Sequence, residues 1–165
     1  MHLIPIQTRK FKATTNSNHS LPVAPNLLNK DFSAEEPCQK WVGDISYIAT
    51  EEGWLYLAII IDLFSRKVVG WALGARMTKQ LVIDAMNQAL NIENPAKGLI
   101  FHSDRGSQNA SYDYQLLLRE HGIRKSMSAK EDSYDNACIE SFFATFKKEL
   151  VYRERYKARS WALYQ

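Results

Sequence analysis

Residues 41–74, WVGDISYIATEEGWLYLAIIIDLFSRKVVGWALG, determine the fold class of this chain. Three segments within them, 41–48, 54–62 and 67–73, are rich in aromatic and β-branched residues, which favour strands. The connections between the segments are short and include the turn residues EEG and SR, and short connections join antiparallel neighbours. The middle segment contains a continuous apolar run, as expected for a strand that is buried on both faces. The stretch therefore predicts a three-stranded antiparallel meander.

The sequence after this meander alternates between helical and extended patterns. Each helical segment repeats its apolar residues with helical spacing and begins near a residue that caps helices well, namely Thr78, Ser111, and Asp135 or Asn136. The predicted elements are a helix from Thr78 to about Leu90, a strand at 98–104, a helix from Tyr112 to His121, a strand at 123–128 and a helix from Ala137 to about Arg153. The order βββ-α-β-α-β-α predicts an α/β, ribonuclease H-like fold. Its five-stranded mixed sheet would have three antiparallel strands, then α/β crossovers, with helices on both faces.

Length and composition describe one globular domain. The chain has 165 residues, of which 45% are hydrophobic and 12% aromatic, enough apolar material for a core. The formal net charge is only +3, so the distribution of charge is more informative than the total. The last 25 residues hold six lysines and arginines against two glutamates. This excess fits either a solvated helix end or a patch that binds phosphates.

Cysteine and hydropathy patterns exclude several classes of protein. Cys38 and Cys138 are far apart and form no zinc-ligand spacing with the four histidines, so no structural zinc module is expected. The most apolar run, 55–61, is too short to cross a bilayer, and no signal-peptide pattern is present. We therefore expect a soluble protein of the reducing cytoplasm, with no membrane partner.

The N-terminal residues differ in composition from the rest of the chain. Residues 1–38 contain basic side chains, the polar run TTNSNHS and several prolines, which together predict an extended, basic arm. Leu27, Leu28 and Phe32 are the apolar residues expected to hold this arm against the body. Residues 39–165 then form the predicted core domain.

Three acidic residues stand out because of their places in the predicted elements. Asp44 interrupts an apolar strand, so it either faces solvent or has a partner, since an unpaired buried charge is strongly unfavourable. Asp104 ends the fourth strand, where ligand sites gather in α/β sheets, although aspartate also caps turns. Glu140 lies at the start of the last helix, where the helix dipole alone favours an acid.

The combination of these acids predicts a metal site. Asp44, Asp104 and Glu140 would converge at one edge of the predicted sheet. Carboxylate oxygens suit Mg²⁺ or Mn²⁺ rather than zinc, and two such ions about 4 Å apart assist phosphodiester cleavage. Lys147 lies seven residues after Glu140, two helical turns further along the same face. It would either hold a DNA phosphate or be an ordinary surface lysine.

Five segments carry a more specific pattern, and they occur in this order: PNLLNKDF, WVGDISYI, EEGWLYLAIIIDLFSRKVVGWAL, HSDRGSQ and DNACIESFFATFKKEL. Between Asp104 and Glu140 there are 35 residues. In these segments and in this spacing the chain closely resembles the second-reading-frame DDE transposases of bacterial insertion sequences, which share the catalytic core of retroviral integrases. The resemblance covers roughly residues 20–160.

The resemblance implies a role for each matching residue. Asp44, Asp104 and Glu140 would be the catalytic acids and would ligate two Mg²⁺ ions, for which Mn²⁺ would substitute. The residues implied to contact DNA are Lys147, Lys148 and Arg105. The implied reaction is nicking at the ends of the element, followed by attack of the released 3′-OH on another phosphodiester.

The resemblance also implies partners. DNA would be the substrate, both as element ends and as target, and a homo-oligomer would hold two ends together. A separate helix-turn-helix protein from the first reading frame would be a further partner. The enzyme would act in the bacterial cytoplasm, at the nucleoid.

The chain departs from the family pattern without losing an acid. Ser46 stands where threonine is usual, Asn109 where tyrosine is usual and Glu131 where glycine is common. The core at 39–165 also ends before the arginine-rich terminal stretch of the family, so a C-terminal truncation is expected. Two alternatives to a transposase stay open. One is a ribonuclease H-like nuclease or resolvase that only hydrolyses, and the other is an inactive, truncated remnant that binds DNA.

Overall fold

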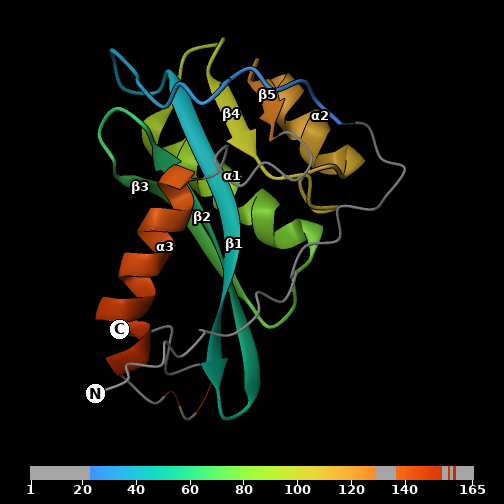
Figure 1. The fold of residues 1–165 in the computed structure, drawn as a ribbon. Helices are drawn as coiled ribbons and strands as arrows, with labels where there is room; N and C mark the ends of the chain where they lie inside the picture. The colour runs from blue at the N-terminus through green and yellow to red at the C-terminus, as the bar shows by residue number, and fades with distance from the viewer. Residues whose placement is uncertain (1–22, 129–136, 154–155, 157, 159–165) are drawn as a thin grey trace, which may run out of the picture.

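The chain folds into a five-stranded sheet with helices on both faces (Figure 1). The structure, a computed structural model, describes residues 23–128, 137–153, 156 and 158. The elements are β1 (Lys40–Thr50), β2 (Gly53–Asp62), β3 (Val68–Gly74), α1 (Lys79–Glu93), β4 (Ile100–Ser103), α2 (Tyr112–Glu120), β5 (Arg124–Met127), α3 (Ala137–Glu149) and the 3₁₀ turn η2 (Val151–Arg153). The element order and the α/β class predicted from the sequence are confirmed.

The sheet is mixed, with the strand order β3-β2-β1-β4-β5. The meander β1-β2-β3 is antiparallel, whereas β1–β4 and β4–β5 are parallel pairs. Tight turns suffice for the antiparallel pairs, while each parallel pair needs a crossover, which α1 and α2 supply. β1 therefore lies at the centre of the sheet, next to the strand that leads into Asp104.

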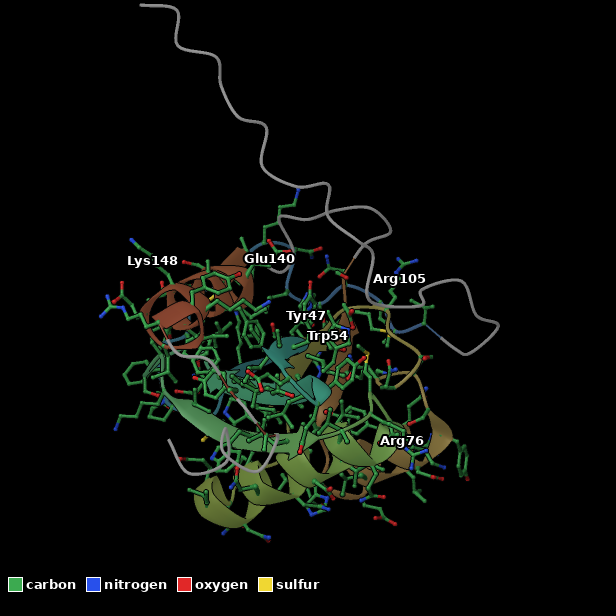
Figure 2. The ribbon with its side chains drawn as sticks, turned by 90° about the horizontal axis from the view of Figure 1, so that it is seen from below. Tyr47, Trp54, Arg76, Arg105, Glu140 and Lys148 are labelled. Carbon is green, nitrogen blue, oxygen red and sulfur yellow. The ribbon has the colours of Figure 1, made fainter. Side chains whose placement is uncertain are left out.

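The helices divide between the two faces of the sheet. Helices α1 and α2 share one apolar cluster with Trp41, Ile45 and Phe101. Helix α3 packs on the opposite face through Ile139 and Phe143, which join a second cluster. Figure 2, seen from below, shows α3 on one side of the sheet and α1 on the other.

The ends of several elements differ from the sequence prediction. The last helix was expected to reach about Arg153, but α3 ends at Glu149 and the chain continues as η2. The reason is that Val151 is buried in a small cluster with Ile48 and Leu55, which draws the chain out of the helical path. Thr78 and Ser111 occupy the N-cap positions, although neither side chain makes a capping hydrogen bond. The caps expected at 135–136 lie outside the described residues.

The described part of the N-terminal segment packs along the body. The Leu27 backbone N–H donates to Ser126 Oγ at 2.8 Å, and the Met127 N–H donates to the Pro25 carbonyl at 3.3 Å. Leu28 is fully buried in the cluster under α3. These contacts confirm that apolar residues pin this segment to the sheet, while the boundary between 38 and 39 stays a prediction. Within the described ranges, no helix combines the length and apolarity that a membrane crossing requires.

Candidate active site

Asp44 lies at the centre of the candidate site. It sits on the central strand β1 and is half-buried. Its Oδ1 accepts a hydrogen bond from the Ile45 backbone N–H at 2.7 Å. Burial and the nearby carboxylate of Asp104 raise the pKa of Asp44 to about 7, and Glu140 adds to the rise. Like charges raise a carboxyl pKa only from nearby, so both other acids lie close enough to Asp44 to act on it electrostatically.

Asp104 owes its position to the parallel pair of β1 and β4. The register pairs Gly43 with Ser103, so the next residue of each strand is one of the two acids. Asp104 Oδ1 accepts hydrogen bonds from the Gly106 N–H at 3.0 Å and from Asn109 Nδ2 at 2.9 Å. The sequence left two interpretations of Asp104 open, a turn cap and a member of a ligand site. Asp104 does cap its turn, and it also lies near Asp44.

Glu140 projects from the first turn of α3 and is exposed. Its neighbour Ile139 is buried and holds this turn against the sheet. Among the residues that the structure describes, no group of three His, Cys, Asp or Glu side chains lies close enough to hold a metal ion. Asp104 and Glu140 thus lie close enough to Asp44 to affect its pKa, but the three side chains are not close enough together to coordinate one metal ion.

The basic residues predicted to contact DNA occupy different environments. Lys147 is half-buried, and burial lowers its pKa while the carboxylate of Asp44 opposes this effect. Lys148 is exposed on the same helix. Arg105 Nε donates to the Ser128 carbonyl at 2.8 Å, and in Figure 2 Arg105 and Lys148 lie on opposite sides of the molecule. The structure therefore brings Lys147 near Asp44, and the roles of Lys147, Lys148 and Arg105 as DNA contacts stay predictions.

Sequence reasoning missed the role of Asn109. The residue was noted only as a departure from the family pattern, yet it is buried and its amide holds Asp104. Its backbone carbonyl in turn accepts a hydrogen bond from Lys125 Nζ at 2.5 Å, and burial lowers the pKa of Lys125 to about 8. The unusual amide at this position was the only signal in the sequence, and local patterns do not reveal which carboxylate it contacts.

The raised pKa of Asp44 predicts that Asp44→Asn stabilises the metal-free protein above neutral pH. Because the folded-state pKa lies above the unfolded value, the wild type loses stability as pH rises from about 4 to 7. Each pKa unit corresponds to about 1.4 kcal/mol, and solvent screening at a half-buried carboxyl leaves an expected gain of about 2 kcal/mol at pH 8. Thermal unfolding of wild type and Asp44→Asn in EDTA at pH 4 and pH 8 measures this gain in stability. An equal effect of the variant at both pH values would contradict the prediction.

Residues 34–133 match the model of the integrase core domain family. The chain belongs to the integrase core domain family. This integrase core is 52% identical over 157 residues to an uncharacterized 31 kDa protein of insertion element IS600 from Shigella sonnei, covering 95% of this chain and 58% of that protein. It is 51% identical over 152 residues to the transposase InsF of insertion sequence IS3A from Escherichia coli K12, covering 92% of this chain and 53% of that protein. The chain thus spans just over half the length of these relatives, and the resemblance to bacterial insertion-sequence transposases is confirmed.

Solved structures show the same fold at lower identity. The integrase core is similar to a chain of a simian T-cell lymphotropic virus intasome in complex with PP2A regulatory subunit B56 gamma. The TM-score is 0.66 at 20% identity, with 84% of this chain and 47% of that chain covered. It is also similar to the HTLV-2 integrase catalytic core domain in complex with magnesium. The TM-score is 0.59 at 20% identity, with 70% of this chain and 72% of that chain covered. These similarities confirm the ribonuclease H-like fold.

Proposed function

We propose that this integrase core nicks DNA and joins DNA strands as the catalytic part of a bacterial insertion-sequence transposase. The observation that carries the proposal is the register of β1 and β4, which brings Asp44 and Asp104 side by side. Burial, the carboxylate of Asp104 and, more weakly, that of Glu140 raise the pKa of Asp44 to about 7. Such a group of mutually repelling carboxylates is unfavourable on its own and is typical of functional sites. The transposase InsF relatives, at 51% identity, support the same reaction.

The donor atoms of the site fit a hard divalent cation. Asp44, Asp104 and Glu140 offer only carboxylate oxygens, which Mg²⁺ prefers, and Mn²⁺ accepts the same ligands. Burial is the main cause of the raised pKa of Asp44 and repulsion from Asp104 and Glu140 adds to it; a cation bound at the acids would favour the ionised form and offset both effects. A pair of bound ions supplies activation of an attacking oxygen and stabilisation of the leaving oxygen of a phosphodiester. Occupancy by two Mg²⁺ ions belongs to this proposal.

The protein's own groups prepare the site. The amide of Asn109 and the backbone N–H of Gly106 both donate to Oδ1 of Asp104, which holds the carboxylate in place. Lys147 lies near Asp44, where a cation attracts the phosphate of an approaching strand. We assign Asp44, Asp104 and Glu140 as the catalytic acids and Lys147, with Lys148 and Arg105, as DNA contacts.

The partners proposed for this activity follow from the reaction. Joining an element to a target requires DNA on both sides of the reaction and two element ends held together, which a homo-oligomer on DNA provides. One of the similar solved structures is an intasome chain. A helix-turn-helix protein from the first reading frame and location at the nucleoid complete the proposal.

A strand-joining assay tests the proposed function. The purified chain is incubated with a labelled duplex that ends in a free 3′-OH and with supercoiled plasmid, in Mg²⁺, Mn²⁺ or EDTA. We expect labelled strand covalently joined to plasmid in either metal and none in EDTA. Nicked plasmid without a joined product would indicate a nuclease or resolvase. DNA binding without nicking or joining would indicate an inactive remnant.

A further inference from the structure

An aromatic pair lies on the β1–β2 hairpin, further along β1 than the acids. Tyr47 on β1 and Trp54 on β2 are diagonal neighbours, because the register pairs Tyr47 with Tyr56 and Ala49 with Trp54. Their ring centroids are 4.7 Å apart and the rings meet edge to face at 79°. The Trp54 side chain is nevertheless 49% exposed. The indole thus packs against Tyr47, and about half of the residue is exposed.

Lys147 connects this pair to the acids. Its Nζ lies 4.4 Å from the centroid of the Tyr47 ring, in cation–π geometry, and it also lies near Asp44. Tyr47 follows Asp44 by three residues on one strand, a separation of about 10 Å along β1. The aromatic pair therefore lies within one or two nucleotide lengths of the candidate active site.

The edge of β1 beside these residues is only partly paired. β1 pairs with β4 over Lys40–Gly43 and forms an isolated bridge from Thr50 to Tyr156, and the described residues place no strand on that edge between Asp44 and Ala49. Figure 2 looks onto this end of the molecule and shows Tyr47 and Trp54 between Lys148 on α3 and Arg105 on the opposite side. A lysine in contact with a half-exposed aromatic pair is a combination found in single-strand binding sites.

We propose that Trp54, supported by Tyr47, stacks on an unpaired nucleobase of the DNA strand whose phosphodiester lies at the acids. Lys147 and Lys148 would attract the adjacent phosphates. An unpaired base is the favoured occupant, because bases inside a duplex already stack on each other and present no face to a side chain. The inference rests on the proposed function and adds to it the way in which a strand is held open at the site.

Trp71 offers a matched control. It is a second tryptophan of similar exposure, 47% against 49% for Trp54, and it lies on the edge strand β3. Wild type, Trp54→Ala, Trp54→Phe and Trp71→Ala are compared in EDTA, so that no cleavage occurs. The probes are a duplex with a short single-stranded overhang containing 2-aminopurine and the same duplex with blunt ends.

We expect Trp54→Ala to weaken binding of the overhang DNA at least about fivefold, while Trp54→Phe stays close to wild type. Quenching of 2-aminopurine fluorescence should be present in the wild type and lost in Trp54→Ala. The slope of log Kd against log salt should not change, because stacking removes no phosphate contact. Trp71→Ala should match wild type in all of these measurements. Circular dichroism confirms that each variant is folded.

Several results would overturn the inference. Equal overhang affinity for Trp54→Ala and Trp71→Ala would show that the Tyr47–Trp54 pair only stabilises the hairpin. Equal losses on blunt and overhang DNA would assign Trp54 to duplex binding. A reduced salt slope in Trp54→Ala would mean that the substitution acts by displacing Lys147. Failure of the wild type to bind either DNA at low salt would overturn the proposed function itself, an outcome distinct from the other three.

Discussion

Asp104→Asn is expected to lower the rates of metal-dependent nicking and joining of DNA at least about a thousandfold. A bound metal ion contributes several kcal/mol to the reaction, and each 1.4 kcal/mol is about a factor of ten in rate. The substitution removes the charge that attracts the cation but changes the shape of the side chain very little. Asparagine Oδ1 also accepts the hydrogen bonds that Gly106 N–H and Asn109 Nδ2 now make to Asp104. We therefore expect the fold to persist and the chemistry to be lost.

Rates of nicking and joining with Mg²⁺ or Mn²⁺ measure this effect. The matched control is Asp113→Asn, which neutralises an exposed acid on α2 that pairs with Lys79. The control should keep wild-type rates and stability, because exposed ion pairs contribute less than about 1 kcal/mol. If Asp104→Asn retained more than a tenth of the wild-type rate, Asp104 would not be a metal ligand.

Gly70→Ala is expected to destabilise the fold by about 3 kcal/mol through a clash between β3 and α1. An added Cβ at Gly70 would lie 2.3 Å from the carbonyl oxygen of Ala85 and 2.7 Å from the Cβ of Ala89. The first contact is with backbone inside a helix, which cannot move aside as a flexible side chain does. Relief of the clash requires α1 to separate from the sheet, which opens the cluster that α1 shares with β1 and β2.

The melting temperature of Gly70→Ala should fall by about 6–12 °C, since 1 kcal/mol corresponds to about 2–4 °C in a chain of this size. Gly74→Ala is the control on the same strand. Its added Cβ would approach the flexible Leu81 Cδ1 at 3.2 Å and make ordinary van der Waals contact with the Arg76 backbone at 3.5 Å or more, so a change of less than about 1 kcal/mol is expected. Equal melting temperatures for the two variants would show that β3 and α1 have room to separate at Gly70 without loss of packing.

Asp44 is expected to lower the stability of the metal-free protein, and its proposed role in the active site explains why it is there. Asp44→Asn should stabilise the metal-free protein above neutral pH, yet the same carboxylate is the centre of the proposed site. Active sites commonly hold groups that destabilise the empty protein, because those groups are arranged for a ligand or for a transition state. The half-buried position of Asp44 on the central strand is an instance of this relation.

The path from sequence to site can be followed at Asp44 and Asp104. Alternation of aromatic and β-branched residues predicted β1, and the apolar run ending in HSD predicted β4. The rule that ligand sites gather beyond strand ends singled out Asp104, and the predicted sheet led us to expect Asp44 at the same edge. The register that pairs Gly43 with Ser103 and the two donors to Asp104 Oδ1 came only from the folded structure.

By itself the amino-acid sequence determined the order of the elements, the mixed sheet and the family, and it singled out the three candidate acids. These depend on local periodicity and on motifs that lie within single segments of the chain. Only the tertiary structure decided that α3 ends at Glu149, that Asn109 holds Asp104 and that Lys147 reaches the ring of Tyr47. Each of these three features depends on contacts between segments that are distant along the chain. The geometry of such contacts follows from strand register and side-chain packing, which periodicity does not encode.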